Sequence, residues 1–204
     1  PEAGMNIVER DFWWGDECDT MVSARDYDFS RPFFIQFQEL LKATPLPAVF
    51  IGKSVNTEYG NHVGEAKNCY LASASWMDED VFYSVMANNV KNPMDSYIIT
   101  DSEFCYEDVS IMKSNRVFFS DQVTACTDSA FLFDCKNCDH CFLSTNLRNK
   151  QYVFENIQYS KDEYLEKIQE FKLSSHRNLL KGLKRFELIR QKAIHRFANM
   201  INSD

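Results

Sequence analysis

Three cysteines and one histidine lie close together in the sequence, in the stretch CKNCDHC at 135–141. Cys135 and Cys138 have the separation at which paired cysteines chelate Zn²⁺. Cys141 repeats that separation and His140 precedes it, so the four ligands of a tetrahedral zinc site are nominally present. However, a structural zinc site usually joins two separate ligand pairs, and cysteine is also a small apolar residue that suits a core position. The sequence therefore favours buried thiols, with zinc as the alternative.

A second candidate set is basic and lies near the C-terminal end of the chain. Such a cluster on one helix could bind a phosphate backbone, which predicts association with nucleic acid. The alternative is an amphipathic helix docked on the acidic remainder of the chain, which needs no partner. The basic residues are Arg177, Lys181, Lys184, Arg185, Arg190, Lys192 and Arg196.

Sequence motifs of the common enzyme classes are missing. The chain has no G-x-S-x-G, P-loop, H-E-x-x-H or G-x-G-x-x-G motif, and four histidines among many serines and aspartates define no triad. Acidic residues recur between Asp78 and Asp134 and could line a carbohydrate-cleaving groove. Such acids more often form a solvated face, so we predict no catalytic residue and keep a glycan-acting enzyme as a second alternative.

These residues belong to a stretch, 68–156, that repeats one short pattern. Each copy has two or three apolar residues, led by a small or polar residue and closed by a turn. Single steps of about 12 residues suit a short strand plus a turn. Two steps together give 22 to 26 residues, which is within the range of solenoid repeats. The copies read NCYL, DVFYS, DSYIIT, EFCYE, RVFFS, SAFLFD, HCFLS and QYVFE.

The connecting segments are rich in Asn, Asp, Ser and Lys, which mark corners rather than helices. Each strand is too short to bury a face alone, so stacked neighbours must supply the core. The many aromatic residues would then form ladders inside the stack. We therefore predict a mainly β protein, a parallel β-solenoid with two or more strands per coil; an antiparallel sandwich or meander is the alternative. Cysteines expected to be buried and free of metal are Cys69, Cys105, Cys126 and Cys141.

Helices are predicted on both sides of the repeats. Residues 32–43 place apolar residues at helical spacing after a possible N-cap at Ser30, and this helix is expected to cap the first coil. Ser160 and Glu163 form a capping box that opens a second helix, expected to cover the last coils. A longer basic helix follows Ser175, and the chain up to Leu173 is expected to fold without it. The predicted domains are 1–47 (irregular segment and capping helix), 48–159 (solenoid) and 160–204 (helical segment).

The composition indicates a protein of a reducing compartment. Its net charge of −8 hides an asymmetry, because residues 160–204 carry a net positive charge and the remainder is strongly acidic. Seven cysteines, an odd number scattered through the repeats, are not typical of a secreted disulfide framework. No apolar run reaches the length of a membrane span or of a signal-peptide core. We therefore expect a cytoplasmic location and no membrane partner.

Several stretches resemble an uncharacterised family of repetitive, cysteine-rich bacterial proteins that combine a zinc ribbon with a β-solenoid. Residues 25–41, 67–71, 131–168 and 195–203 carry the resemblance, and 147–164 is its most specific part. The family has no established activity, so the resemblance implies an architecture only. Its members begin with Cys-x-x-Cys before a Trp-Trp pair, whereas no cysteine precedes Trp13 here. This departure favours packing as the role of the remaining cysteines.

Together these features predict a non-catalytic solenoid scaffold that presents a rigid, acidic face to a protein partner or to a second copy. Nucleic-acid association through the basic helix is the alternative. No cofactor is predicted, apart from the possible zinc ion at 135–141.

Overall fold

The structure is a computed structural model that describes residues 4–57 and 59–196. Contacts divide the chain into two compact units, Pro1–Phe50 and Ile51–Asp204. The helical segment that the sequence analysis set apart at 160–204 thus shares a unit with the solenoid.

The first unit is a small helical and irregular unit. It contains strand β1 (Ile7–Val8), which pairs in parallel with β2 (Leu46–Pro47), helix α1 (Arg10–Trp13), a 3₁₀ helix (Thr20–Ser23) and helix α2 (Phe33–Ala43). Pro32, not Ser30, is the N-cap of α2. The buried Gln36 side chain accepts a hydrogen bond from the Asp28 backbone N–H and donates to the Asp28 and Arg31 carbonyls. These bonds tie the preceding loop to the helix.

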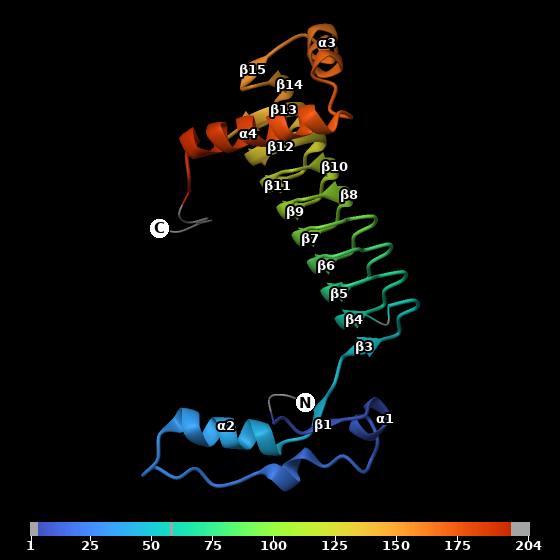
Figure 1. Cartoon of the computed structure of the whole chain (residues 1–204), viewed down its shortest axis with the longest axis vertical. Helices are drawn as coiled ribbons and strands as arrows, with labels where there is room; N and C mark the ends of the chain where they lie inside the picture. The colour runs from blue at the N-terminus through green and yellow to red at the C-terminus, as the bar shows by residue number, and fades with distance from the viewer. Residues whose placement is uncertain (1–3, 58, 197–204) are drawn as a thin grey trace. The chain divides into compact units, whose positions relative to one another are not determined.

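The second unit is a parallel β-solenoid, as the sequence predicted, and not an antiparallel sandwich (Figure 1). In-register partners such as Asn61 and Ser73, or Val85 and Tyr97, lie 12 residues apart. One coil is therefore 12 residues long, and the predicted coil of 22 to 26 residues is wrong. The stack also begins before residue 68, because β3 and β4 lie in a region that the sequence analysis assigned to turns.

Most strands of the solenoid are four residues long. Along one side run β3 (Ile51–Gly52), β4 (Asn61–Gly64), β5 (Ser73–Trp76), β6 (Val85–Asn88), β7 (Tyr97–Thr100), β9 (Val109–Met112) and β11 (Asp121–Thr124). A second ladder holds β8 (Glu103–Tyr106) and β10 (Asn115–Phe118), and both ladders continue into β12 (Thr127–Lys136) and β13 (Asp139–Thr145). The last strands are β14 (Gln151–Phe154) and the antiparallel β15 (Ile157–Gln158).

The short coil results from a backbone turn at every third residue. Asn68, Leu71, Ala74 and Met77 all have φ between 50° and 57°, and this left-handed conformation recurs through the stack. Asn and Asp adopt it most easily, because their short polar side chains can bond locally. Each triplet consequently contributes one inward residue, one outward residue and one turn residue, and four triplets close a coil.

Small polar residues are essential to the interior. The hydroxyl of Ser84 accepts a hydrogen bond from the backbone N–H of Ser96 in the next coil (3.3 Å) and donates to the Phe82 carbonyl (2.9 Å). Cys126 uses its thiol similarly towards the backbone N–H of Cys138 (3.4 Å). Inward N–H groups would otherwise be buried without a partner, at a cost of about 1–3 kcal/mol each. Inward Ser and Cys therefore stabilise the coils as acceptors, while inward Val and Ile supply apolar contact.

The aromatic residues form ladders outside the stack, not inside it as predicted. Two adjacent outward columns make up what we call the aromatic face. The first column contains Tyr70, Phe82, Met94, Tyr106, Phe118, Ala130, Phe142 and Phe154. The second contains Tyr59, Leu71, Tyr83, Asp95, Glu107, Phe119, Phe131, Leu143 and Glu155.

Two helices cover the C-terminal end of this face. Helix α3 (Lys161–Phe171) begins with the predicted capping box, and Tyr164 and Phe171 pack against the last coils as predicted. Helix α4 (His176–Lys192) lies across β12 and β13 (Figure 1). Phe186 of α4 is buried against Phe131, so α4 is docked on the solenoid.

Candidate functional site

The cysteines of the 135–141 stretch point into the solenoid. Cys135, Cys138 and Cys141 are buried, and the thiol of Cys138 lies within hydrogen-bonding reach of those of Cys126, Cys135 and Cys141. The predicted burial of Cys69, Cys105, Cys126 and Cys141 is confirmed. His140 is a turn residue and lies on the outer surface, beside Tyr152 and Tyr164. The structure thus brings Cys126, and not His140, to the other three cysteines.

This arrangement suits packing better than reactivity. The contact with Cys138 and burial raise the pKa of the thiols of Cys126, Cys135 and Cys141 far above the ordinary range. Metal ligation and nucleophilic attack both require a thiolate. Cys135 and Cys141 instead donate to the carbonyls of Phe133 and Asp139, the pattern that inward serines show elsewhere.

A double substitution, Cys135→Ser with Cys138→Ser, separates packing from zinc binding. Serine keeps the hydrogen bonds of the inward positions, so we expect the circular dichroism to be preserved. The melting temperature should fall by less than about 8 °C, because a loss of about 2 kcal/mol shifts a domain of this size by 2–4 °C per kcal/mol. Unfolding of the variant, together with loss of stoichiometric zinc in elemental analysis, would establish the metal site instead.

His140 belongs to a different cluster on the surface. Its ligand atom and those of Asp128 and Asp139 lie within 4.8 Å of one another, and this is the sole such group among residues 4–57 and 59–196. Both carboxylates already have partners: Asp128 forms an ion pair with Arg116, and Asp139 accepts a hydrogen bond from Thr127 (2.7 Å). Nδ1 of His140 lies 2.8 Å from Oδ1 of Asp139. The cluster is a charge-compensated network in the absence of any ligand.

The basic residues of α4 divide into two groups. Arg185 forms an ion pair with Glu155 and Arg190 with Asp121 (3.5 Å), so these two hold α4 on the solenoid. Lys181 and Lys184 line a groove of about 390 Å³ between α3 and α4. Arg177 and Lys192 form no ion pair with the described residues. Half of the predicted nucleic-acid set therefore serves docking, and nucleic-acid association stays a prediction.

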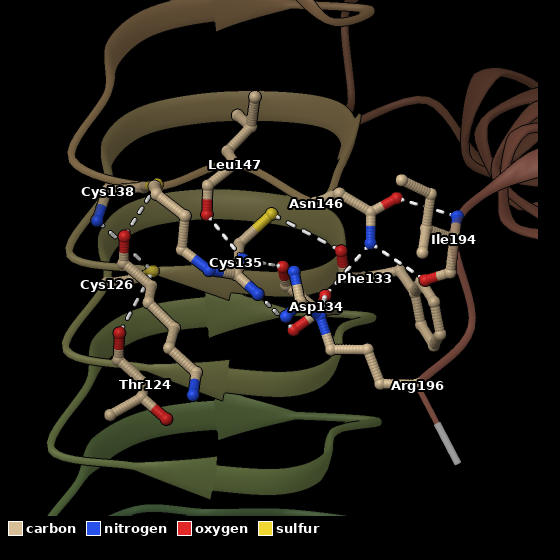
Figure 2. A network of polar contacts seen from close by, with 12 residues as sticks. Thr124, Cys126, Phe133, Asp134, Cys135, Cys138, Asn146, Leu147, Ile194 and Arg196 are labelled. Carbon is tan, nitrogen blue, oxygen red and sulfur yellow. Dashed lines mark hydrogen bonds and ion pairs between the residues drawn. The ribbon is translucent and has the colours of Figure 1, made fainter. Parts of the chain in front are cut away.

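Arg196, the last of that set, ties the segment after α4 to the coils (Figure 2). Its guanidinium lies 3.0 Å from Asp134, which also pairs with Arg148 (2.6 Å). Burial by itself would raise the pKa of Asp134, but hydrogen bonds from Asn146, Arg148 and Arg196 lower it. The Asn146 side chain also bonds both backbone groups of Ile194.

The acids between 78 and 134 do not gather on one side. Asp78 and Asp108 point into the core, Asp121 pairs with α4, and Asp128 pairs with Arg116. Glu79 lies between Lys67 and Lys91, at 3.0 and 3.7 Å. The acids predicted to line a carbohydrate-cleaving groove thus serve mostly as internal partners.

The surface without an internal partner is the N-terminal part of the aromatic face. Beneath α3 and α4, Phe119, Phe131 and Leu143 are buried. In the coils before them, Leu71 and Tyr83 of the same column are 49% and 48% exposed. The uncovered aromatic face, as we call it, consists of Tyr59, Tyr70, Leu71, Phe82, Tyr83 and Met94.

The sequence analysis did not single out this surface, although it had recorded the residues. Its signal is a spacing of 12 between apolar residues such as Leu71 and Tyr83, together with acidic residues in the same column. Asp95 and Glu107 continue that column and give the face an acidic margin. Glu107 is close enough to Tyr106 for their hydrogen bond to raise the pKa of the tyrosine.

Comparison with protein-family models and with curated proteins finds no match for this chain. The resemblance to the cysteine-rich solenoid family therefore stays a prediction. In the part of the chain that the structure describes, no helix has the length and apolar character that a membrane span requires.

Proposed function

We propose that this chain is a non-catalytic β-solenoid scaffold that binds a protein partner through the uncovered aromatic face and its acidic margin. The observation that carries the proposal is the contrast along one column, in which Phe131 is fully buried and Tyr83 is half exposed. The chain thus builds an apolar face longer than its own helices cover.

Two physical arguments support this function. Contiguous exposed apolar patches mark interaction sites on soluble proteins, and aromatic residues dominate the binding energy of protein interfaces. In addition, stacked coils hold the side chains at fixed spacing, so a partner can bind without ordering a loop. Tyr70 and Tyr83 already contact each other edge to face, with ring centroids 5.7 Å apart.

Photocrosslinking tests the proposal. A crosslinking amino acid at position 83 should give a discrete adduct in extracts of the source cells. The same amino acid at Met77, which is equally exposed but lies outside the aromatic face, should give none. Excess unlabelled protein should compete for the adduct, whereas excess Phe82→Asp protein should not. Equal labelling from both positions, or competition by Phe82→Asp, would count against the proposed surface.

A further inference from the structure

The surface that binds α4 recurs five coils earlier in the solenoid. The covered copy of this surface and the uncovered copy have the same kinds of residue at equivalent positions of both columns. In the second column, Phe119, Phe131, Leu143 and Glu155 correspond to Tyr59, Leu71, Tyr83 and Asp95. In the first column, Ala130, Phe142 and Phe154 correspond to Tyr70, Phe82 and Met94. Three apolar residues followed by an acid thus occur twice in one column.

The covered copy shows what such a surface binds. The Phe186 ring of α4 lies 5.9 Å from that of Phe131, and Leu183 and Ile189 pack against the same cluster. Arg185 of α4 forms an ion pair with Glu155, the acid of the column. An amphipathic helix with an apolar stripe and a basic margin therefore satisfies both the apolar and the acidic parts of the surface.

The uncovered copy has the same features without an occupant. Tyr59, Leu71 and Tyr83 are half exposed or more. Asp95, which corresponds to Glu155, forms no ion pair with residues 4–57 and 59–196. Five coils at about 4.8 Å each separate the copies by about 24 Å. A helix is about 10 Å in diameter, so a second helix can lie on the uncovered copy beside α4.

We infer that the uncovered copy binds an amphipathic α-helix of a partner protein, with apolar residues against Leu71 and Tyr83 and an Arg or Lys paired with Asp95. This inference rests on the proposed function and adds the class of ligand. The helix binds crosswise to the solenoid axis, in the way that α4 lies across β12 and β13 (Figure 1).

One difference between the copies allows them to be distinguished. A Cβ atom at Gly182 of α4 would lie 2.9 Å from the Phe131 ring, so the covered copy requires glycine at this point of the helix. The equivalent residue of the uncovered copy is Leu71, which has no ring to meet that atom. A helix with alanine in place of Gly182 is therefore disfavoured at the covered copy and accepted at the uncovered one.

The experiment uses a peptide as the probe. It has the sequence of residues 175–193 with Gly182→Ala, carries a fluorophore, and is titrated with the full chain while anisotropy is measured. We expect saturable binding, weakened at least tenfold by Leu71→Asp or Tyr83→Asp and unchanged by Met77→Asp. Asp95→Asn, and replacement of Arg185 by Gln in the peptide, should each reduce the affinity severalfold and reduce its dependence on salt.

Two results would overturn the inference. In the first, the peptide does not bind, or binds equally well to the Leu71→Asp and Tyr83→Asp chains, which would mean exchange at the covered copy. In the second, the full chain is a dimer in light scattering and Tyr83→Asp makes it monomeric, which would identify a second copy as the occupant. A crosslink at position 83 without peptide binding would retain the proposed function and reject the helical ligand. Circular dichroism of each variant verifies that the coils are folded.

Discussion

The substitution Phe186→Asp is expected to destabilise the solenoid by at least 3–5 kcal/mol, the usual cost of deleting a buried phenylalanine. Phe186 is 8% exposed and packs on Phe131, which is fully buried. An aspartate there would remove the ring and place a charge in an apolar site. Because domains are stable by about 5–15 kcal/mol, the change should be visible as early thermal unfolding and binding of a hydrophobic dye.

Leu188 provides the matched control. It is on the same helix but 59% exposed, so Leu188→Asp should change the stability by about 0.5 kcal/mol or less. If both variants melt together, α4 is peripheral, and a chain ending at Leu173 would fold by itself, as the sequence alone predicted. The structure leads us to expect the opposite, because removal of α4 would expose Phe119, Phe131 and Leu143.

The second large effect concerns pH. Burial raises the pKa of Asp78 from 3.8 to about 6 and that of Asp108 well above its ordinary value. A carboxyl group whose pKa is higher in the folded than in the unfolded chain stabilises the fold only while protonated. Its contribution is complete below the unfolded pKa and is lost as pH rises through the folded pKa. For Asp78 the loss is about 3 kcal/mol by pH 8, since each pKa unit corresponds to 1.36 kcal/mol.

Asp78→Asn isolates this effect from those of the other acids. Oδ1 of Asp78 accepts the Val90 backbone N–H (3.1 Å), whereas Oδ2 is buried without a hydrogen-bond partner in the described structure. An asparagine keeps the first bond and carries no charge. The variant should therefore be more stable than the parent by about 3 kcal/mol at pH 8, and by about 0.6 kcal/mol at pH 4. Parallel stability curves in denaturant titrations across this range would show that Asp78 is ionised without cost.

The sequence was sufficient for the architecture but not for the length of a coil. Short apolar pairs at steps of about 12 indicated stacked parallel strands, and the capping box at Ser160 and Glu163 identified the start of α3. The coil length was wrong because a turn at every third residue has no familiar residue signature. Leu71, Met77 and Phe104 occupy left-handed positions as Asn68 does, so residue type does not mark the turns.

The candidate sites were harder to predict, because orientation follows from that same three-residue period. With one inward residue in three, Cys135, Cys138 and Cys141 all point inwards, and His140 cannot join them. The aromatic residues, read as a core, prove to be outward for the same reason. For the basic residues, the docked helix was among the alternatives, but the partners Glu155 and Asp121 were not predictable before the coil register was known.

The uniform coil also makes the molecule a ruler. Because all coils have the same 12 residues and the same register, inserting or deleting one coil would move everything beyond it by about 4.8 Å and leave each column in line. A change of one or two residues would instead turn the inward residues outward. Gain or loss of whole coils would therefore change the separation between α4 and a helix bound at Leu71 and Tyr83 in equal steps, while the chemistry of both surfaces stays the same.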